Sequence, residues 1–215
     1  KYSSIYGIVE EKDADDFQKD IKEINTGIIC FNKKRLAECL KYIKPNNRKK
    51  EYYLTDIVSI FYKKGYLADA VKISDINEAL GINSRSDLAK ANSIMQVRIN
   101  EDLMKSGVTL IDPATAFISY GTKVGVDTTI YPFTVIERDV KIGNRCRIGP
   151  FIHLRENTQL DDDVVLGNFL EVNRSKISSR SRAKHFCYLA DSKIGKNVNI
   201  GAGTVIANFD GKKKN

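Results

Sequence analysis

The chain has 215 residues, of which 42% are hydrophobic and 29% charged, a balance typical of a soluble globular protein. Its net charge of +8, from 35 lysines and arginines against 27 acidic residues, favours anionic partners in general. The densest basic runs, 48–50 and 212–214, contain no interleaved aromatic residues, so we expect no nucleic-acid partner. No apolar run approaches the length of a membrane span, and no membrane association is expected either.

Four cysteines form no Cys-x-x-Cys pair and no zinc-type spacing with the two histidines. They are therefore expected to be free thiols in a reducing, cytoplasmic setting. The chain begins at Lys1, without a methionine and without a leader-like segment. For that reason we expect it to be an internal piece of a longer protein.

Residues 1–83 alternate strand and helix signals. Residues 34–42 have the apolar spacing of a helix that Pro45 stops, and Thr55 or Asp56 is placed to begin a second helix. Short apolar stretches predict three strands, at residues 4–9, 27–31 and 71–73. The mixture predicts part of an α/β domain.

Residues 84–107 carry the clearest helix signal. Ser84 and Asp87 form a capping-box pattern at its start, and Gly107 ends it. Between them, apolar residues recur at helical spacing: Leu88, Ala91, Met95, Ile99 and Leu103. We interpret this helix as the connection between an N-terminal domain and the repeats that follow.

Residues 108–215 contain a repeat of six residues. An aliphatic residue occupies every sixth position at Ile118, Val124, Ile130, Ile136, Ile142, Ile148, Leu154, Leu160, Leu166 and Val172. Six is an even number, so an extended chain returns the same face inward at each repeat, which predicts short strands in a stacked solenoid. The residue two positions before each of these aliphatic residues is often small or β-branched. Cys146 occupies such a position, two before Ile148, and is therefore expected to be buried.

The six-residue register slips by one after Val172 and again after Leu189. It restarts at Ile177 and then at Ile194. Slips in a repeat often mark backbone that is shaped for function rather than for stacking.

Motifs along the chain resemble one family. The N-terminal part contributes Gly7-Ile-Val-Glu10-Glu-Lys-Asp13, Glu23-Ile-Asn25-Thr-Gly27, Glu51-Tyr-Tyr-Leu-Thr-Asp56 and Gly81-Ile-Asn83. The repeats contribute His185-Phe-Cys-Tyr188-Leu-Ala-Asp191 and Asn197-Val-Asn199-Ile-Gly-Ala-Gly-Thr204. Together they resemble the bifunctional UDP-N-acetylglucosamine pyrophosphorylases that are also glucosamine-1-phosphate N-acetyltransferases.

The resemblance implies a fold with two parts. The repeats would form a truncated left-handed parallel β-helix, with three hexapeptides to a coil, that assembles as a homotrimer. Residues 1–83 would be the C-terminal part of a Rossmann-like nucleotidyltransferase domain, whose nucleotide loop, catalytic lysine and metal-binding aspartate would precede Lys1. The isolated chain is therefore expected to transfer no uridylyl group.

The resemblance also implies two sets of site residues. In the first domain, Glu10, Asn25 and Asn83 would bind UDP-N-acetylglucosamine, and Asn83 would help to hold Mg2+. In the β-helix, His185 would be the catalytic base, because histidine titrates in the range needed to deprotonate an amine. The remaining matched positions are Arg155, Tyr188, Asn199, Asn208 and Lys214 for the sugar phosphate and Ala202 for acetyl-CoA, whereas His153 matches no motif and is interpreted as structural.

Two positions depart from the family pattern. Asn173 stands where the family usually carries a substrate-binding lysine, and Phe209 stands where it has a tyrosine. Each loss would weaken substrate binding by about 1–3 kcal/mol. Arg174 is expected to point to the other side of its strand, so it is not a replacement for the lysine.

Two interpretations of the function follow. The first is an enzyme of UDP-N-acetylglucosamine biosynthesis that uses UTP, glucosamine 1-phosphate and acetyl-CoA. In the second, only the nucleotidyltransferase works and the β-helix is a trimerising scaffold with a degenerate acetyl site. A different hexapeptide acyltransferase is disfavoured because the motifs of the N-terminal part also match.

Overall fold

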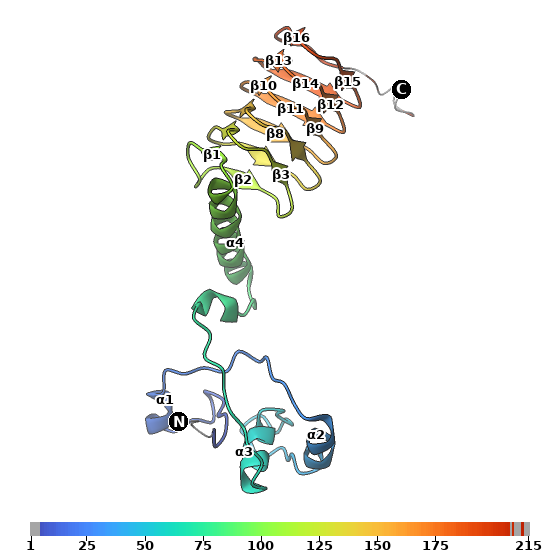
Figure 1. Ribbon diagram of the computed structural model, residues 1–215. Helices are drawn as coiled ribbons and strands as arrows, with labels where there is room; N and C mark the ends of the chain where they lie inside the picture. Colours follow the sequence, from blue (N-terminus) through green and yellow to red (C-terminus); the bar gives the residue numbers. More distant parts are fainter. Residues whose placement is uncertain (1–4, 207, 209–211, 213–215) are drawn as a thin grey trace. The chain divides into compact units, whose positions relative to one another are not determined.

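The computed structural model describes residues 5–206, 208 and 212. The chain divides into two compact units, Lys1–Leu80 and Gly81–Asn215 (Figure 1). Within the described residues, no helix combines the length and the apolar character that crossing a membrane requires.

The first unit is built from short helices around a small core. In chain order they are α1 (Asp16–Lys19), α2 (Lys33–Leu40), α3 (Asp56–Lys63) and the 3-10 helix η1 (Ile76–Ala79). Helices α2 and α3 confirm the two helices predicted from the sequence. The core of this unit consists of Cys39, Ile57, Val58 and Phe61.

The strands predicted in the first unit are wrong wherever the structure describes them. The described part of residues 1–80 contains no strand. The side chain of Ile28 is 84% exposed and that of Val71 is 94% exposed, so these apolar stretches have no sheet to pack into. A strand is stable only when a neighbour completes its hydrogen-bond ladder. The Rossmann-like interpretation of this unit therefore stays a prediction.

Helix α4 (Arg85–Lys105) begins the second unit and confirms the predicted helix, including its capping box between Ser84 and Asp87. It packs against the first strands of the repeat region. Ile99 and Leu103 lie on the repeat core, and buried Asn100 donates hydrogen bonds to the carbonyl oxygens of Pro113 and Ala116 at 2.8 and 3.1 Å. Helix α4 thus covers the first coil of the solenoid. Its role as a connection between domains stays a prediction.

The repeats form short parallel strands, which stack from β1 to β16 in Figure 1. Their bounds are β1 (Thr109–Leu110), β2 (Phe117–Ile118), β3 (Lys123–Val124), β4 (Thr129–Ile130), β5 (Val135–Ile136), β6 (Lys141–Ile142), β7 (Arg147–Ile148), β8 (Ile152–Leu154), β9 (Gln159–Leu160), β10 (Val165–Leu166), β11 (Leu170–Asn173), β12 (Lys176–Ile177), β13 (Arg182–Ala183), β14 (Cys187–Ala190), β15 (Lys193–Ile194) and β16 (Asn199–Ile200).

Every third strand joins the same sheet, so the solenoid has three faces. Face A consists of β1, β4, β7, β10, β13 and β16, face B of β2, β5, β8, β11 and β14, and face C of β3, β6, β9, β12 and β15. This is the parallel β-helix that the repeat predicts. The left-handed sense that the family resemblance implies stays a prediction.

Strand pairing shows where the coil shortens. On face A, Thr129 pairs with Arg147 and Arg147 with Val165, which are equal steps of three full repeats along the chain. Val165 then pairs with Arg182, and Arg182 with Asn199, and each of these steps is shorter by a single residue. Both predicted register slips are thus confirmed as coils that have each lost one residue.

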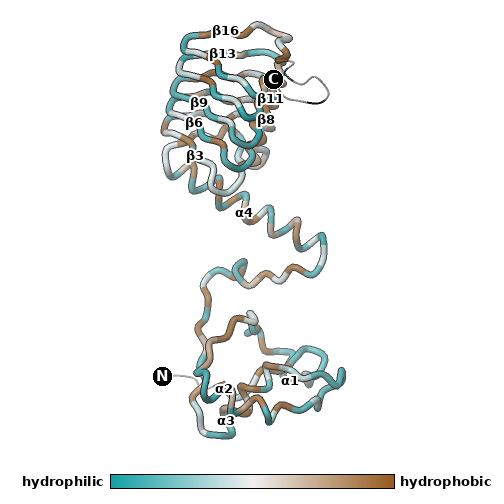
Figure 2. Tube along the Cα trace, turned by 90° about the vertical axis from the view of Figure 1, so that its right-hand side faces the viewer, coloured by the Kyte–Doolittle hydropathy of each residue, from teal (hydrophilic) through white to brown (hydrophobic). Residues whose placement is uncertain are grey.

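The aliphatic positions of the repeat form the core of the solenoid. From Ile118 to Val172 every one is buried except Val124, which is partly buried. Figure 2 shows apolar and polar segments alternating along the coils, as expected of chain that buries one face of each short strand. Cys146 is fully buried, as predicted, and burial raises the pKa of its thiol.

At the corners, non-glycine residues adopt positive φ in three columns. The column between faces A and B contains Phe133, Phe151 and Phe169, whose rings stack at centroid distances of 5.0 and 5.1 Å. Between faces B and C the column consists of Asp139, Asn157, Arg174 and Asp191; between faces C and A it consists of Asp127, Arg145, Asp163, Arg180 and Asn197. Each corner thus repeats one backbone geometry with its own side-chain chemistry.

Candidate functional site

Face B carries a row of polar side chains where its strands lengthen. Register aligns His153 of β8 with Glu171 of β11, and Glu171 with Tyr188 of β14. The residues on either side of Glu171, Leu170 and Val172, are buried in the core. Because side chains alternate across a strand, the aligned row faces outward.

Arg155 lies beside this row, just after the end of β8, as part of a cluster of charges. Its Nη1 donates to Glu171 Oε1 at 3.1 Å, and its Nε lies 4.0 Å from Glu137 Oε1. Nε2 of His153 is 2.7 Å from the same Glu137 oxygen. The hydrogen bond to Glu171 raises the pKa of Arg155 above its ordinary value. The Arg155 side chain is 44% exposed, so solvent screens these pairs and they orient the guanidinium more than they stabilise the fold.

His185 lies at the A–B corner, just before β14, and its side chain is exposed. In the next coil, the backbone N–H of Gly203 donates to the carbonyl of Phe186 at 2.9 Å, and Val205 forms a bridge with Tyr188. Continuing the register of that bridge back along both coils places Ala202 beside His185. The structure therefore brings the predicted base and the predicted acetyl-CoA contact to one corner.

The B–C corner holds two further predicted residues, Asn173 and Asn208. Asn173 is only 4% exposed, and Nδ2 of Asn208 donates to the Ala190 carbonyl at 2.8 Å. Asn173 and Ala190 are paired in the sheet, so Asn208 continues the same corner one coil on. Phe209 and Lys214, the other residues predicted near here, lie outside the described residues.

The expectation for Arg174 is wrong. Arg174 is the corner residue, with φ of +44°, so the strand alternation on which the expectation depended has ended before it. Its Nη1 donates to Asn173 Oδ1 at 3.0 Å, and its Nε and Nη2 donate to the two carboxylate oxygens of Asp191 at 2.6 and 2.8 Å. The side chain thus turns back toward Asn173.

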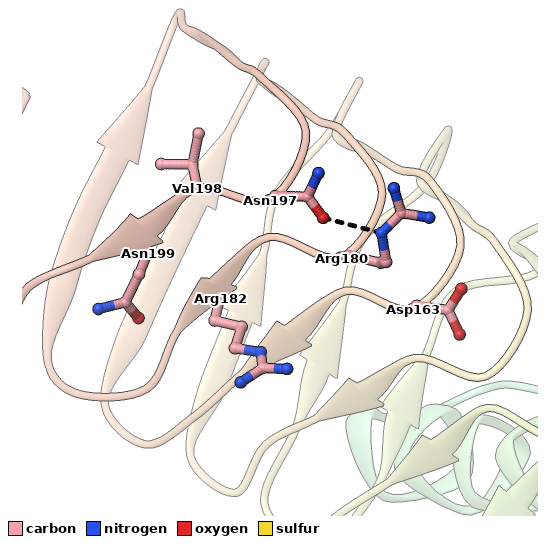
Figure 3. Close-up of a pocket in the computed structure, with 6 residues that line it drawn as sticks. All are labelled: Asp163, Arg180, Arg182, Asn197, Val198 and Asn199. Carbon is pink, nitrogen blue, oxygen red and sulfur yellow. Dashed lines mark hydrogen bonds between the residues drawn. The ribbon is translucent and has the colours of Figure 1, made fainter.

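Asn199 lies on a different face from Tyr188. It belongs to β16 of face A, in register with Arg182 of β13. Both line an open pocket of about 550 Å³, which Figure 3 shows with the two side chains next to each other. Its other lining residues are Asp163, Arg180, Asn197 and Val198, with Arg180 Nε donating to Asn197 Oδ1 at 2.8 Å. A single copy of the chain therefore does not bring Asn199 to the Tyr188 row.

The predicted residues of the N-terminal part show only local interactions. The side chains of Glu10, Asn25 and Asn83 are exposed. Oδ1 of Asn25 accepts from the Gly27 N–H at 3.1 Å, an ordinary Asx turn. The Asn83 N–H donates to Asp87 Oδ2 at 3.2 Å, which serves the start of α4. The roles of Glu10, Asn25 and Asn83 therefore stay predictions.

Sequence reasoning missed the acidic members of the face B cluster, Glu137 and Glu171, and treated His153 as structural. A signal was present in the spacing. Glu137 and Arg155 are separated by three full repeats, as are His153 and Glu171, and three repeats make one coil of the solenoid in this region. Reading polar residues at the coil period, in addition to apolar ones at the period of six, predicts their stacking.

The fold and this row of polar side chains define a class: a parallel β-helix protein of hexapeptide repeats with a polar outer face. Within that class the chain is similar, over nearly its whole length, to the bifunctional protein GlmU of several bacteria. It is 39% identical over 246 residues to GlmU of Geobacillus sp. (strain WCH70), with 99% of this chain and 54% of the relative covered. It is 44% identical over 240 residues to GlmU of Thermosipho africanus, with 96% of this chain and 52% of the relative covered.

GlmU of Heliobacterium modesticaldum is 41% identical over 243 residues, with 98% of this chain and 53% of the relative covered. The family resemblance read from the motifs is confirmed by these relatives, and the chain spans about half of their length. No family model matches it. Serine acetyltransferase isoform 3 of Entamoeba histolytica, solved in complex with cysteine, shares 17% identity with a TM-score of 0.27, covering 65% of this chain and 47% of that one. That score is too low to support an argument.

Proposed function

We propose that the complete gene product makes UDP-N-acetylglucosamine in two steps: acetyl transfer from acetyl-CoA to glucosamine 1-phosphate, then uridylyl transfer from UTP to the acetylated sugar phosphate. The observation that carries this proposal is the relation to GlmU over 96–99% of the chain. The arrangement of His185 and Ala202 at one corner of face B, the face that also carries Tyr188 and Arg155, supports it. We place the enzyme in the cytoplasm, because its proposed substrates are soluble metabolites.

In the acetyl transfer, His185 acts as the general base. The amine of glucosamine 1-phosphate is cationic at neutral pH and has no lone pair until a proton is removed. His185 takes that proton, and the nitrogen then forms a bond to the thioester carbonyl carbon. The carbon–sulfur bond breaks, and coenzyme A leaves as a thiolate that accepts a proton. The side chain of His185 is exposed at the corner, so solvent-borne substrates can reach it.

The site is completed by a neighbouring copy in a homotrimer. Tyr188 and Arg155 belong to face B, whereas Asn199 belongs to face A. Residues on two faces of one rigid prism do not converge on a ligand of sugar-phosphate size. A second copy that presents its own Asn199 to the first copy's face B brings the set together.

The residues present do not by themselves form a magnesium site. Asn83 offers one amide oxygen, and the nearby Asp87 carboxylate is held by the Ser84 hydroxyl and N–H. Among the described residues no group of three His, Cys, Asp or Glu side chains gathers as metal ligands. We therefore derive no step through Mg2+ from this chain, and the Mg2+-dependent uridylyl transfer stays a prediction for the complete gene product. Glu10 and Asn25 are proposed as its sugar contacts.

One observation favours the second interpretation, a nucleotidyltransferase whose β-helix is only a scaffold. Asn173 is buried and uncharged at the position where the family carries a cationic contact. Under that interpretation the complete gene product transfers uridylyl groups but no acetyl groups. Separate assays of the two reactions therefore decide between the interpretations.

The test of the base is His185→Ala in the complete gene product. We expect acetyl transfer to fall by about 100-fold or more, because general-base catalysis contributes on that order, while uridylyl transfer is unchanged. The unaltered protein is the reference for both rates. An acetyl-transfer rate that His185→Ala leaves at the level of the unaltered protein would contradict the assignment.

A further inference from the structure

Arg174 lies where the B–C corner meets face B, and the family resemblance gives it no role. Its positive φ ends strand β11 and turns the side chain back toward the strand. There its guanidinium is held on two sides, by Asn173 Oδ1 at 3.0 Å and by both Asp191 carboxylate oxygens at 2.6 and 2.8 Å. Asp191 is one coil further along the solenoid, so partners from two coils fix the orientation of this guanidinium.

Asn173, which accepts a hydrogen bond from Arg174, is itself buried and held by a neighbouring side chain. Asn173 is 4% exposed, and its carbonyl oxygen accepts a hydrogen bond from Ser175 Oγ at 2.9 Å. An arginine has five N–H donors, and three of those of Arg174 are used in its bonds to Asn173 and Asp191. Within the described residues, two N–H donors remain on a side chain that is 35% exposed.

Strand pairing brings Arg174, Arg155 and Tyr188 to neighbouring positions on face B. The N–H of Arg155 donates to the carbonyl of Val172, two residues before Arg174, at 2.8 Å, and Glu171, which accepts from Arg155 Nη1, is paired with Tyr188. The pKa of Arg174 is raised first by its hydrogen bond to Asp191 and to a smaller extent by the proximity of Tyr188. The pKa of Arg155 is raised first by its hydrogen bond to Glu171, and Tyr188 contributes there too. Tyr188 is therefore within electrostatic range of two guanidinium groups, each oriented by a carboxylate.

We propose that Arg174 is a second phosphate-binding residue of the acetyl-transfer site, which acts with Arg155 beside Tyr188 on the phosphate of a sugar 1-phosphate. This inference rests on the proposed function. A phosphate monoester carries close to two negative charges at neutral pH, and guanidinium groups match its oxygens in geometry as well as in charge.

The charges around the two arginines suit a substrate that is both cationic and anionic. Three carboxylates, Glu137, Glu171 and Asp191, accompany Arg155 and Arg174 on face B and its corner. A purely anionic ligand would meet repulsion from them. An amino-sugar phosphate has an ammonium group that a carboxylate accepts and a phosphate that the guanidinium groups accept. The cation that Asn173 does not supply is thus provided by its neighbour.

The test measures binding directly, by calorimetric titration of the complete gene product with glucosamine 1-phosphate and, separately, with glucosamine. We expect Arg174→Gln to raise the Kd for the sugar phosphate by about tenfold or more, since a charge-assisted contact is lost, and to leave glucosamine binding unchanged. Arg145→Gln is the matched control. Arg145 is also a corner arginine with positive φ, bound through two N–H···O contacts of 2.8 and 3.0 Å to Asp163 one coil on.

A second variant separates the loss of charge from damage to the corner. Adding Asn173→Lys to Arg174→Gln returns an ammonium group to the same place, and we expect it to recover most of the lost affinity for the sugar phosphate. The proposal is overturned if Arg174→Gln binds the sugar phosphate as tightly as the unaltered protein. It is also overturned if Arg145→Gln weakens that binding equally, or if Arg174→Gln weakens glucosamine to the same extent.

These outcomes are separable from the proposed function. An unaltered protein that binds the sugar phosphate through Arg174 but transfers no acetyl group would retain this inference and reject the acetyl-transfer reaction. An unaltered protein that transfers the acetyl group, with Arg174→Gln binding normally, would reject this inference alone.

Discussion

Substituting Gly167 by alanine adds one methyl group and tests both the packing of the coils and the position of His185. Gly167 follows buried Leu166 at the end of β10, and its N–H donates to the Ala183 carbonyl at 2.8 Å. A Cβ at this position would overlap the Lys184 carbonyl oxygen and lie within 2.5 Å of the Lys184 carbonyl carbon. Both atoms belong to backbone, so no side-chain rotation relieves the overlap. Lys184 immediately precedes His185.

Gly167→Ala therefore displaces either coil by about 1 Å, since non-bonded carbon atoms are in favourable contact only at roughly 3.5–4.0 Å. Overpacking of this kind costs about 1–3 kcal/mol of folding free energy. For a chain of this size we expect the midpoint of thermal unfolding to fall by about 2–12 °C. If His185 is the base, a displacement of about 1 Å lowers the acetyl-transfer kcat/KM by about 100-fold.

The measurements are thermal unfolding by circular dichroism and acetyl-transfer kinetics of the complete gene product. Gly195→Ala is the matched control, because Gly195 also follows an aliphatic repeat residue, Ile194, and among the described residues a Cβ there meets only Val198 Cγ2 at 3.8 Å. Equal unfolding midpoints for the two variants would refute the steric reasoning. A destabilised Gly167→Ala variant with undiminished kcat/KM would refute the link from Lys184 to the position of His185.

Two further predictions concern the corner columns. Phe151→Ala removes two ring stacks, with Phe133 and Phe169, and should lower the free energy of unfolding by about 1–3 kcal/mol in denaturant titrations; an equal loss in Phe117→Ala, a variant outside the column, would contradict a role for stacking. The hydrogen bond from Arg145 lowers the pKa of Asp163 in the folded protein. The Asp163 carboxylate therefore contributes stability above its pKa in the unfolded chain, and this contribution disappears as the pH falls through its pKa in the folded protein. The stability difference between the unaltered protein and Asp163→Asn should accordingly shrink from pH 7 toward pH 3, and a difference independent of pH would contradict this pairing.

In this solenoid the candidate site is formed by side chains that stack in rows along one face, and not by single loops. On face B, side chains from successive coils stand one above another, and a coil shortened by one residue brings Arg174 to the corner. Because the face is continuous from β8 to β14, the positions of Arg155, Glu171 and Tyr188 are fixed by strand pairing. A ligand site of this kind is preorganised by the backbone, which limits the ordering needed when substrate binds.

Local spacing in the sequence determined a large part of this protein. The aliphatic period from Ile118 to Val172 predicts the solenoid, because an even period returns the same face of an extended chain inward whatever the rest of the chain does. The capping box at Ser84 and the helical spacing after it predict α4 in the same way. The register slips are visible as missing residues, so the shortened coils are predicted too.

Which residues are neighbours in space was decided only by the tertiary structure. Strands at residues 27–31 and 71–73 do not form, because a strand depends on a neighbour that local sequence does not specify. The strand alternation predicts Arg174 on the far side, but the left-handed backbone at the corner turns it onto Asn173 and Asp191. Likewise, motif order places Tyr188 and Asn199 close together in sequence, whereas the turn of the coil sets them on different faces of the prism.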